Sequence, residues 1–165
     1  MDLSVVIPLY NESESIEELN KWITNTLNSK SISFEIIYID DGSSDGSWDI
    51  IKRLADSSNN IKGISFSKNF GKSQALNSGF IECKGKFVAT LDADLQDSPE
   101  EIPEMIDKLK KENLDLISGW KKRRFDSLIL KKIPSKLFNF VASCSSGIKI
   151  HDFNCGIKVF KSEVI

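Results

Sequence analysis

Short apolar runs alternate with amphipathic segments along most of the chain. The apolar runs are rich in β-branched and aromatic residues and therefore predict strands, at Leu3–Ile7, Phe34–Ile39, Ile61–Phe66, Phe87–Leu91, Leu114–Ser118 and Gly156–Phe160. Apolar residues at helical spacing predict helices between them, at Glu14–Leu27, Ser47–Ser57, Lys72–Cys83, Pro99–Glu112 and Leu128–Ala142. Nearly continuous apolar strands separated by helices are typical of an α/β fold, with a mostly parallel sheet covered on both faces.

Polar or charged residues follow each of the first five predicted strands, in the segments 8–12, 40–43, 68–72, 92–94 and 119–121. The carboxyl ends of parallel strands share one edge of the sheet, and open α/β sheets bind their ligands there. Loops are usually polar, so any one segment is weak support. Five in succession predict a binding crevice.

Three carboxylates, those of Asp92, Asp94 and Asp97, follow the fourth predicted strand. A helix start comes next, marked by Ser98 as N-cap and Pro99 at the first helical position. Carboxylates this close repel one another unless a cation lies among them. Hard oxygen ligands suit Mg²⁺ or Mn²⁺, often shared with phosphate oxygens. An Asp-x-Asp pair is also common in solvated loops, and Asp97 could be only a helix cap.

Asp40 and Asp41 follow the second predicted strand and precede Gly42. They could form a plain turn, but a carboxylate held at the sheet edge also suits an N–H or amino group of a nucleoside base. The segment 68–72 leads into a helix whose free N–H groups and dipole favour anions. Lys72 is accordingly a candidate for nucleotide binding, and a solvent-facing lysine is the alternative.

Two common nucleotide-binding motifs are missing. Gly-x-Gly-x-x-Gly is absent from the first strand–helix turn, and Gly71-Lys72-Ser73 lacks the upstream glycine of a P-loop. A dinucleotide fingerprint and a P-loop are therefore both excluded.

The chain has 165 residues, enough for one domain with its own core. A formal net charge of −2 argues against a nucleic-acid partner, but the charge is unevenly distributed. Residues 92–104 carry six acids and no base, whereas residues 121–136 carry seven bases and the single acid Asp126. We therefore expect an acidic pocket that attracts a cation and a basic segment that attracts anions.

The three cysteines, Cys83, Cys144 and Cys155, lack any Cys-x-x-Cys spacing, so we expect reduced thiols rather than disulfides or a zinc site. His151 is the sole histidine and is more readily explained as structural than as a metal ligand. We expect no signal peptide, because the chain does not begin with a basic region followed by an apolar one. We also expect no membrane-spanning helix, because no apolar stretch approaches ~20 residues.

With these motifs in view, the chain resembles an inverting family 2 glycosyltransferase. Within that family it is most similar to the branch of dolichol-phosphate mannose synthase and the bacterial polyprenyl-phosphate glycosyltransferases. The resemblance runs from Val5 to Phe160 and rests on the motifs at 8–12, 40–46, 69–76, 92–100 and 151–156. The Asp-Leu-Gln-Asp-x-Pro-Glu run within 92–100 points to the lipid-phosphate branch. The implied fold is glycosyltransferase A-type, a Rossmann-like, mostly parallel sheet with helices on both faces.

The resemblance also implies roles for individual residues. Those expected at the nucleotide are Pro8, Tyr10, Glu12, Asp40, Asp41 and Asp92, to which the helix start adds Lys72. Those expected on Mg²⁺ or Mn²⁺ are Asp92, Asp94 and Gln96, and those facing an acceptor phosphate are Lys121, Arg124 and Ser135. Asp152 matches the position often assigned as the base. The family commonly has arginine at position 121, so Lys121 loses a bidentate phosphate contact.

The implied activity is metal-dependent transfer of a hexose from a UDP- or GDP-linked donor to a polyprenyl phosphate, undecaprenyl or dolichyl, with inversion. Residues 1–165 would form a single catalytic domain. Related proteins continue into membrane-associated segments, so we expect a truncated, soluble piece of a protein that acts at the cytoplasmic face of a membrane. The run 128–141 could rest on that membrane or be a buried core helix.

Two alternatives stay open at this point. One is a family 2 transferase acting on a hydroxyl of a glycan or cell-surface polysaccharide. The other is a non-catalytic module that binds nucleotide sugars. The sequence indicates neither the sugar, the base nor the oligomeric state.

Overall fold

A computed structural model describes residues 1–119 and 155–165 of the chain. The chain divides into two compact units, residues 1–117 with 157–165, and residues 118–156. Most of the second unit lies outside the described residues, so a single domain over 1–165 stays a prediction. The elements are β1 Leu3–Leu9, α1 Ile16–Ser29, β2 Phe34–Asp40, α2 Ser47–Ser57, β3 Ile61–Ser65, α3 Lys72–Ile81, β4 Phe87–Thr90, the 3₁₀ turn η1 Pro99–Glu101, α4 Ile102–Glu112, β5 Leu116–Ser118, β6 Lys158–Lys161 and the 3₁₀ turn η2 Ser162–Val164.

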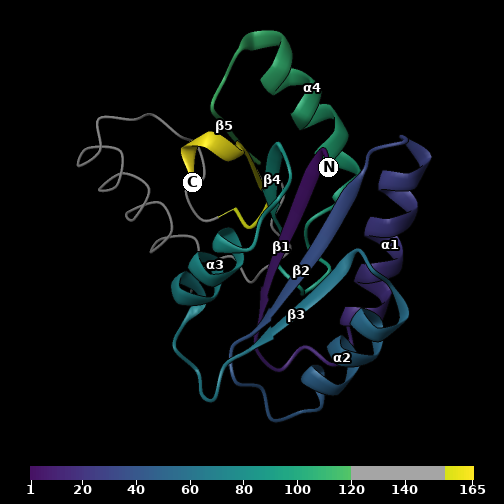
Figure 1. Ribbon diagram of the computed structural model, residues 1–165, viewed down its shortest axis with the longest axis vertical. Helices are drawn as coiled ribbons and strands as arrows, with labels where there is room; N and C mark the ends of the chain where they lie inside the picture. Colours follow the sequence, from purple (N-terminus) through teal and green to yellow (C-terminus); the bar gives the residue numbers. More distant parts are fainter. Residues whose placement is uncertain (120–154) are drawn as a thin grey trace, which may run out of the picture. The chain divides into compact units, whose positions relative to one another are not determined.

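The strands form one sheet in the order β3-β2-β1-β4-β6-β5 (Figure 1). β1 pairs in parallel with β2 and with β4, and β2 pairs in parallel with β3. β6 runs antiparallel to β4. The mostly parallel α/β fold predicted from the sequence is confirmed. All six predicted strands are present, although the last two begin later than predicted, at Leu116 and Lys158.

Adjacent residues of β2 show that helices cover both faces of the sheet. The Tyr38 hydroxyl donates a hydrogen bond to Asn20 of α1 at 3.2 Å. The next residue, Ile39, points to the opposite face of the sheet, where it packs with Val6 of β1 and with Ala75 of α3. Every residue of β1 and β2 is buried, which explains their continuous apolar sequence.

The helix after β4 begins as the sequence predicts. Ser98 is the N-cap of η1, its hydroxyl accepts the N–H of Glu100 at 3.3 Å, and Pro99 follows at the first position. α4 continues directly from this turn. The predicted helix Leu128–Ala142 lies outside the described residues. Among the helices of the described part of the chain, none is long and apolar enough to cross a membrane.

The helix α3 packs unusually close to the sheet at Gly79. A Cβ atom at that position would lie 2.4 Å from a methyl carbon of Val6 and 2.7 Å from Ile39. Real Cβ atoms do not approach other atoms so closely, so any larger residue would force the buried side chains of Val6 and Ile39, or α3 itself, to shift.

A buried polar cluster holds the carboxyl end of α3. The carboxylate of Glu35, a residue only 2% exposed, accepts the hydroxyl of Ser4 at 2.7 Å and the backbone N–H of Lys84 at 2.8 Å. Lys62 lies 3.5 Å from the other carboxylate oxygen. The Ser4 hydroxyl oxygen also accepts the N–H of Gly85 at 2.9 Å. These bonds tie the turn after α3 to the amino ends of β1 and β2.

Candidate active site

A pocket of about 350 Å³ opens at the carboxyl edge of β1, β2 and β4. Its walls are formed by Pro8, Leu9, Tyr10, Glu12, Asp41, Asn69, Gly71, Lys72, Ala75, Asp92, Ala93 and Asp94. The volume is in the usual range for a small-molecule site. The segments that line it follow β1, β2, β3 and β4, which confirms the crevice expected at this edge.

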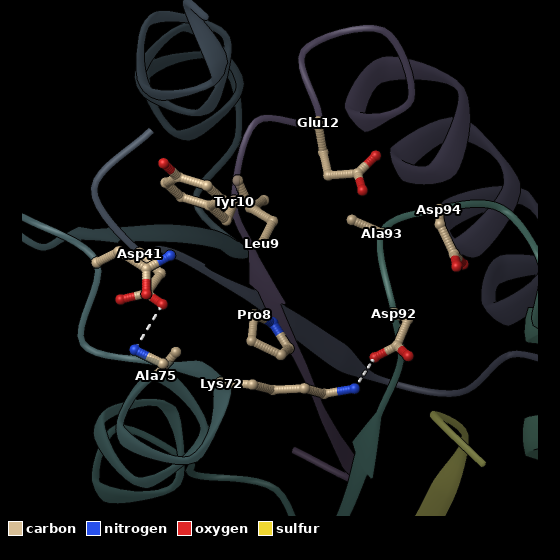
Figure 2. Close-up of a pocket in the computed structure, with 12 residues that line it drawn as sticks. Pro8, Leu9, Tyr10, Glu12, Asp41, Lys72, Ala75, Asp92, Ala93 and Asp94 are labelled. Atoms are coloured by element: carbon tan, nitrogen blue, oxygen red, sulfur yellow. Dashed lines mark hydrogen bonds and ion pairs between the residues drawn. The ribbon is translucent and has the colours of Figure 1, made fainter. Parts of the chain in front are cut away.

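The pocket has two chemically different sides, as Figure 2 shows. Tyr10 and Asp41 lie on one side, and Asp92 and Asp94 lie on the other. The side chain of Lys72 extends between them, past Pro8. An aromatic ring with a carboxylate on one side suits a nucleoside. Paired carboxylates with a nearby lysine suit a diphosphate and its counter-ions.

Asp40 and Asp41 have separate roles in the structure. Asp40 is 1% exposed, and its carboxylate accepts the N–H of Ser43 at 3.1 Å and the hydroxyl of Ser65 at 3.3 Å. It is not among the pocket-lining residues. Asp41 lines the pocket, and its two oxygens accept the N–H groups of Phe70 at 2.7 Å and Gly71 at 2.9 Å. The geometry thus favours the turn role for Asp40 and leaves Asp41 facing the ligand space.

The turn at Gly42 allows the loop after β3 to approach Asp41. Gly42 has φ +76°, a left-handed conformation that side chains other than glycine rarely adopt. A Cβ atom here would lie 2.5 Å from the carbonyl carbon of Lys68 and 2.8 Å from the backbone N of Asn69. Glycine is therefore needed both for the turn and for the close approach of the two backbones.

The loops after β1 and β2 are joined by side-chain hydrogen bonds. Ser43 accepts the N–H of Asn11 at 2.8 Å, and Ser47 accepts the N–H of Glu12 at 3.0 Å. Asp45 accepts the N–H of Ser13 at 2.9 Å and the hydroxyl of Ser47 at 2.6 Å. These bonds fix the backbone that carries Glu12 into the pocket.

Asp45 is the most strongly perturbed acid in this loop pair. Desolvation acts to raise its pKa, but hydrogen bonds from Ser47 and Ser13 outweigh that effect. The pKa of Asp45 therefore lies well below the ordinary value of 3.8. Its carboxylate stays ionised while it links the two loops.

The acidic segment after β4 divides between pocket and core. Asp92 and Asp94 line the pocket, whereas Asp97 is 4% exposed and is not part of the lining. No group of three or more acidic, histidine or cysteine side chains placed to hold a metal occurs in residues 1–119 and 155–165. Two of the three acids, Asp92 and Asp94, therefore reach the pocket, and Asp97 is buried outside its lining.

A tight turn explains where Gln96 lies. Leu95 has a positive φ of 59°, and Asp94 accepts the N–H of Gln96 at 3.1 Å. The turn leaves Gln96 exposed and outside the pocket lining. The donor set in the pocket itself is the pair Asp92 and Asp94. Two carboxylates fit Mg²⁺ or Mn²⁺ that takes its other ligands from phosphate and water.

Lys72 forms an ion pair with Asp92 across the pocket. The distance from Nζ to Oδ1 is 2.5 Å, and the two side chains are 53% and 28% exposed. The dashed line in Figure 2 marks this contact. Lys72 therefore lines the pocket while about half of its side chain stays exposed to solvent.

The remaining predicted pocket residues lie where expected. Tyr10 is 48% exposed and presents its ring at the pocket. Glu12 accepts the hydroxyl of Ser15 at 3.2 Å. The predicted acceptor residues Lys121, Arg124 and Ser135, together with Asp152 and His151, lie outside the described residues.

Neither of the described cysteines, Cys83 and Cys155, forms a disulfide. Burial raises the pKa of the Cys83 thiol to about 11. Cys83 is therefore a poor nucleophile at neutral pH.

The local sequence does not reveal the role of every residue at the site. Asn69 and Gly71 line the pocket, and the sequence marks them only as members of the candidate segment 68–72 and of the 69–76 motif. The linking role of Asp45 also went unnoticed, because a run of serine, aspartate and glycine residues at 42–47 is typical of any solvated turn.

Comparisons with known proteins agree with this geometry. Residues 4–165 match the family described as Glycosyl transferase family 2. The chain is 34% identical over 166 residues to a dodecaprenyl-phosphate galacturonate synthase from Rhizobium johnstonii, covering all of this chain and 49% of that protein. It is 37% identical over 164 residues to an undecaprenyl-phosphate 4-deoxy-4-formamido-L-arabinose transferase from Salmonella choleraesuis, covering 99% of this chain and 50% of that one. The chain thus spans about half the length of these relatives.

Solved structures show a similar fold. A mannosyltransferase from Pyrobaculum calidifontis in complex with GDP-Man and Mn²⁺ has a TM-score of 0.68 at 21% identity, over 98% of this chain and 45% of that one. A glucosyl-3-phosphoglycerate synthase from Mycobacterium tuberculosis, in complex with Mn²⁺, UDP and phosphoglyceric acid, has a TM-score of 0.76 at 20% identity, over 99% of this chain and 56% of that one. These similarities confirm the expected A-type fold.

Proposed function

Because the chain belongs to glycosyl transferase family 2, we propose that it transfers a sugar from a nucleoside diphosphate to a polyprenyl phosphate, with inversion at the anomeric carbon. The observation that carries this proposal is the pocket itself. It combines Tyr10 and Asp41 on one side with Asp92, Asp94 and Lys72 on the other. The acceptor class is inferred from the relatives named for dodecaprenyl and undecaprenyl phosphate.

On the donor side, the aromatic face of Tyr10 can pack against the nucleoside base, and the carboxylate of Asp41 can accept hydrogen bonds from N–H groups of that base. Each oxygen of Asp41 already accepts one backbone N–H. An ionised carboxylate has about four acceptor positions, so capacity for a base remains. We assign the base contact to Asp41 rather than Asp40, since Asp40 is buried outside the pocket lining.

On the phosphate side, Asp92 and Asp94 would hold Mg²⁺ or Mn²⁺. Such an ion, when bound, supplies positive charge that stabilises the leaving diphosphate. The side chain of Lys72 reaches this side of the pocket from the start of α3 and adds positive charge beside Asp92. In the reaction an oxygen of the acceptor phosphate attacks the anomeric carbon while the bond to the donor diphosphate breaks.

On the acceptor side, the proposal rests on the sequence resemblance. Lys121, Arg124 and Ser135 would contact the lipid phosphate, and Asp152 would lie at the reacting centre. Gln96 stays a candidate ligand of the ion from outside the pocket lining. The protein would act at the cytoplasmic face of a membrane, where polyprenyl phosphates present their head groups.

A transfer assay tests the proposal. Thermal shifts with UDP, GDP and CDP in Mn²⁺ first select the base, since a ligand at ~100 times its dissociation constant adds ~2.7 kcal/mol of stability. The protein is then incubated with labelled sugars linked to that base and with undecaprenyl phosphate, dolichyl phosphate or undecaprenol. We expect lipid-linked product with a phosphate acceptor and none with undecaprenol.

Two outcomes would overturn this function. Transfer to oligosaccharide hydroxyls but not to lipid phosphate would indicate a glycan-acting transferase of the same family. Donor binding without transfer to any acceptor would indicate a nucleotide-sugar-binding module.

A further inference from the structure

The ion pair of Lys72 and Asp92 occupies the place where the proposed function needs a divalent ion. The lysine is the first residue of α3, and its Nζ lies 2.5 Å from Oδ1 of Asp92. Figure 2 shows the ammonium group on the Asp92 side of the pocket, away from Asp41. A carboxylate oxygen that already holds an ammonium at this distance is partly neutralised.

An ammonium group and a divalent cation on one carboxylate repel each other strongly. Asp94, the second candidate ligand, is exposed and forms no ion pair with a lysine of residues 1–119 or 155–165, so the ammonium and the metal compete at Asp92. Metal binding at Asp92 must therefore move the Lys72 ammonium.

The displaced ammonium has a destination within the same pocket. Lys72 carries its charge on a flexible four-carbon stem, and its side chain is half exposed. Its backbone is fixed by Gly71, whose N–H binds Asp41, so the side chain pivots about a fixed point. From that point, a donor diphosphate beside Asp92 and Asp94 would lie within reach of the ammonium.

We propose that Lys72 is a tethered counter-ion, which neutralises Asp92 in the unliganded protein and passes to the donor diphosphate when the metal binds. This inference rests on the proposed function for the identity of the donor. The consequence is that metal binding and nucleotide binding are coupled. A metal that binds alone breaks the ion pair of Lys72 with Asp92 and leaves the ammonium without a partner. When the nucleotide binds as well, its diphosphate becomes the new partner of the ammonium. Each ligand should therefore strengthen the binding of the other.

Mn²⁺ binding to the purified protein tests this coupling without any activity measurement. Free Mn²⁺ is followed by its electron paramagnetic resonance signal, with and without the nucleoside diphosphate selected by thermal shift. Lys72→Met removes the ammonium but keeps an unbranched side chain. We expect Lys72→Met to bind Mn²⁺ alone several-fold more tightly than the unmodified protein. The gain in Mn²⁺ affinity on adding nucleotide should shrink about tenfold.

Two control variants make the result specific. Lys108→Met removes the same charge from an exposed position on α4, outside the pocket, and should leave both affinities unchanged. Lys72→Arg keeps the charge and should retain the coupling. Circular dichroism of each variant establishes that it is folded.

The outcomes separate this inference from the proposed function. Unchanged or weaker binding of Mn²⁺ alone to Lys72→Met would overturn the counter-ion role. Tighter Mn²⁺ binding with undiminished coupling would overturn the transfer of the ammonium to the diphosphate. If the unmodified protein bound no nucleoside diphosphate with Mn²⁺ present, the proposed function itself would fail.

Discussion

The carboxylate of Asp41 accepts the backbone N–H of Gly71 at 2.9 Å, and Gly71 is the residue that immediately precedes α3. The second oxygen of Asp41 accepts the N–H of Phe70 at 2.7 Å. Asp41 is 4% exposed, so these bonds are largely shielded from water. One acid at the end of β2 thus positions the start of the helix that carries Lys72.

Asp41→Asn should therefore affect both stability and ligand binding. An amide has one acceptor oxygen, so one of the two N–H groups would lose its partner, at a cost of about 1–3 kcal/mol in the free energy of unfolding. Nucleotide affinity should fall at least about tenfold, equivalent to about 1.4 kcal/mol. Urea denaturation and calorimetric titration measure the two effects. Asp49→Asn is the control, because its ion pair with Lys52 is on the exposed surface of α2.

Gly42→Ala and Gly46→Ala form a matched pair, since both residues have positive φ, +76° and +91°. A Cβ atom at Gly46 meets nothing within 4 Å, so Gly46→Ala should cost about 1 kcal/mol for the left-handed backbone alone. A Cβ atom at Gly42 clashes with the backbone at Lys68, so that substitution should cost at least about 1 kcal/mol more. Equal losses in urea denaturation would contradict the close approach of these two loops.

Asp45 should make stability depend on pH in the acid range. Its pKa in the folded protein lies below the ordinary value of 3.8, so the unfolded chain binds the proton first as the pH falls. The stabilisation is fully present above the unfolded pKa and is lost as the pH falls toward the folded pKa, between about pH 5 and pH 2. Asp45→Asn should be less stable near neutral pH and should lose less on acidification.

Denaturant titrations at several pH values measure this difference. Asp107→Asn, on the exposed side of α4, is the control and should follow the unmodified protein. Parallel pH profiles for Asp45→Asn and the unmodified protein would show that the loop bonds do not depend on the charge.

Nucleotide binding should require a divalent ion. A carboxylate ~4 Å from a phosphate charge costs ~4 kcal/mol at an effective dielectric of ~20. Lys72 offsets only the charge of Asp92, so Asp94 without a metal opposes the donor. Affinity for UDP or GDP should be lost in EDTA and restored by Mn²⁺ or Mg²⁺. Asp94→Asn should weaken metal-supported binding, whereas the exposed Glu104→Gln on α4 should not. Equal affinity in EDTA and in Mn²⁺ would argue against a metal-bridged donor.

We expect Asp152 to orient the groups around the reacting centre rather than to act as a general base. A phosphate monoester has a second pKa of ~6, so the acceptor oxygens are mostly ionised at neutral pH and need no base. Asp152→Asn should then retain much more transfer activity than Asp152→Ala. A hydroxyl acceptor would be indicated if both variants were equally inactive and if the transfer rate of the unmodified protein increased with pH around a pKa typical of a carboxylate.

The sequence predicts the strands of the sheet well, because burial on both faces leaves β1 and β2 with continuous apolar runs. It does not distinguish Asp40 from Asp41. Which of these neighbours faces the pocket depends on the direction of the chain at Gly42, and that direction is set by contact with Lys68. The sequence also does not predict that β6 is antiparallel to β4, because strand direction depends on the path of the intervening chain.

The pairing of Lys72 with Asp92 is a further feature that local pattern does not reveal. The two residues are on different segments, and their contact follows from how closely α3 packs on the sheet. Both residues were expected at the nucleotide, but their direct contact requires the tertiary structure. The burial of Asp97, which follows the turn at Leu95, is likewise visible only in the tertiary structure.

The fixation of α3 at both ends has a consequence for the thermodynamics of donor binding. The Glu35 cluster holds the turn that follows it, Gly79 in its last turn packs against Val6 and Ile39, and Asp41 holds its amino end. The helix is therefore preorganised before any ligand arrives, and its conformational entropy is already lost in folding. Within residues 1–119, the ordering that accompanies donor binding therefore falls mainly on flexible side chains at the pocket, chiefly the stem of Lys72.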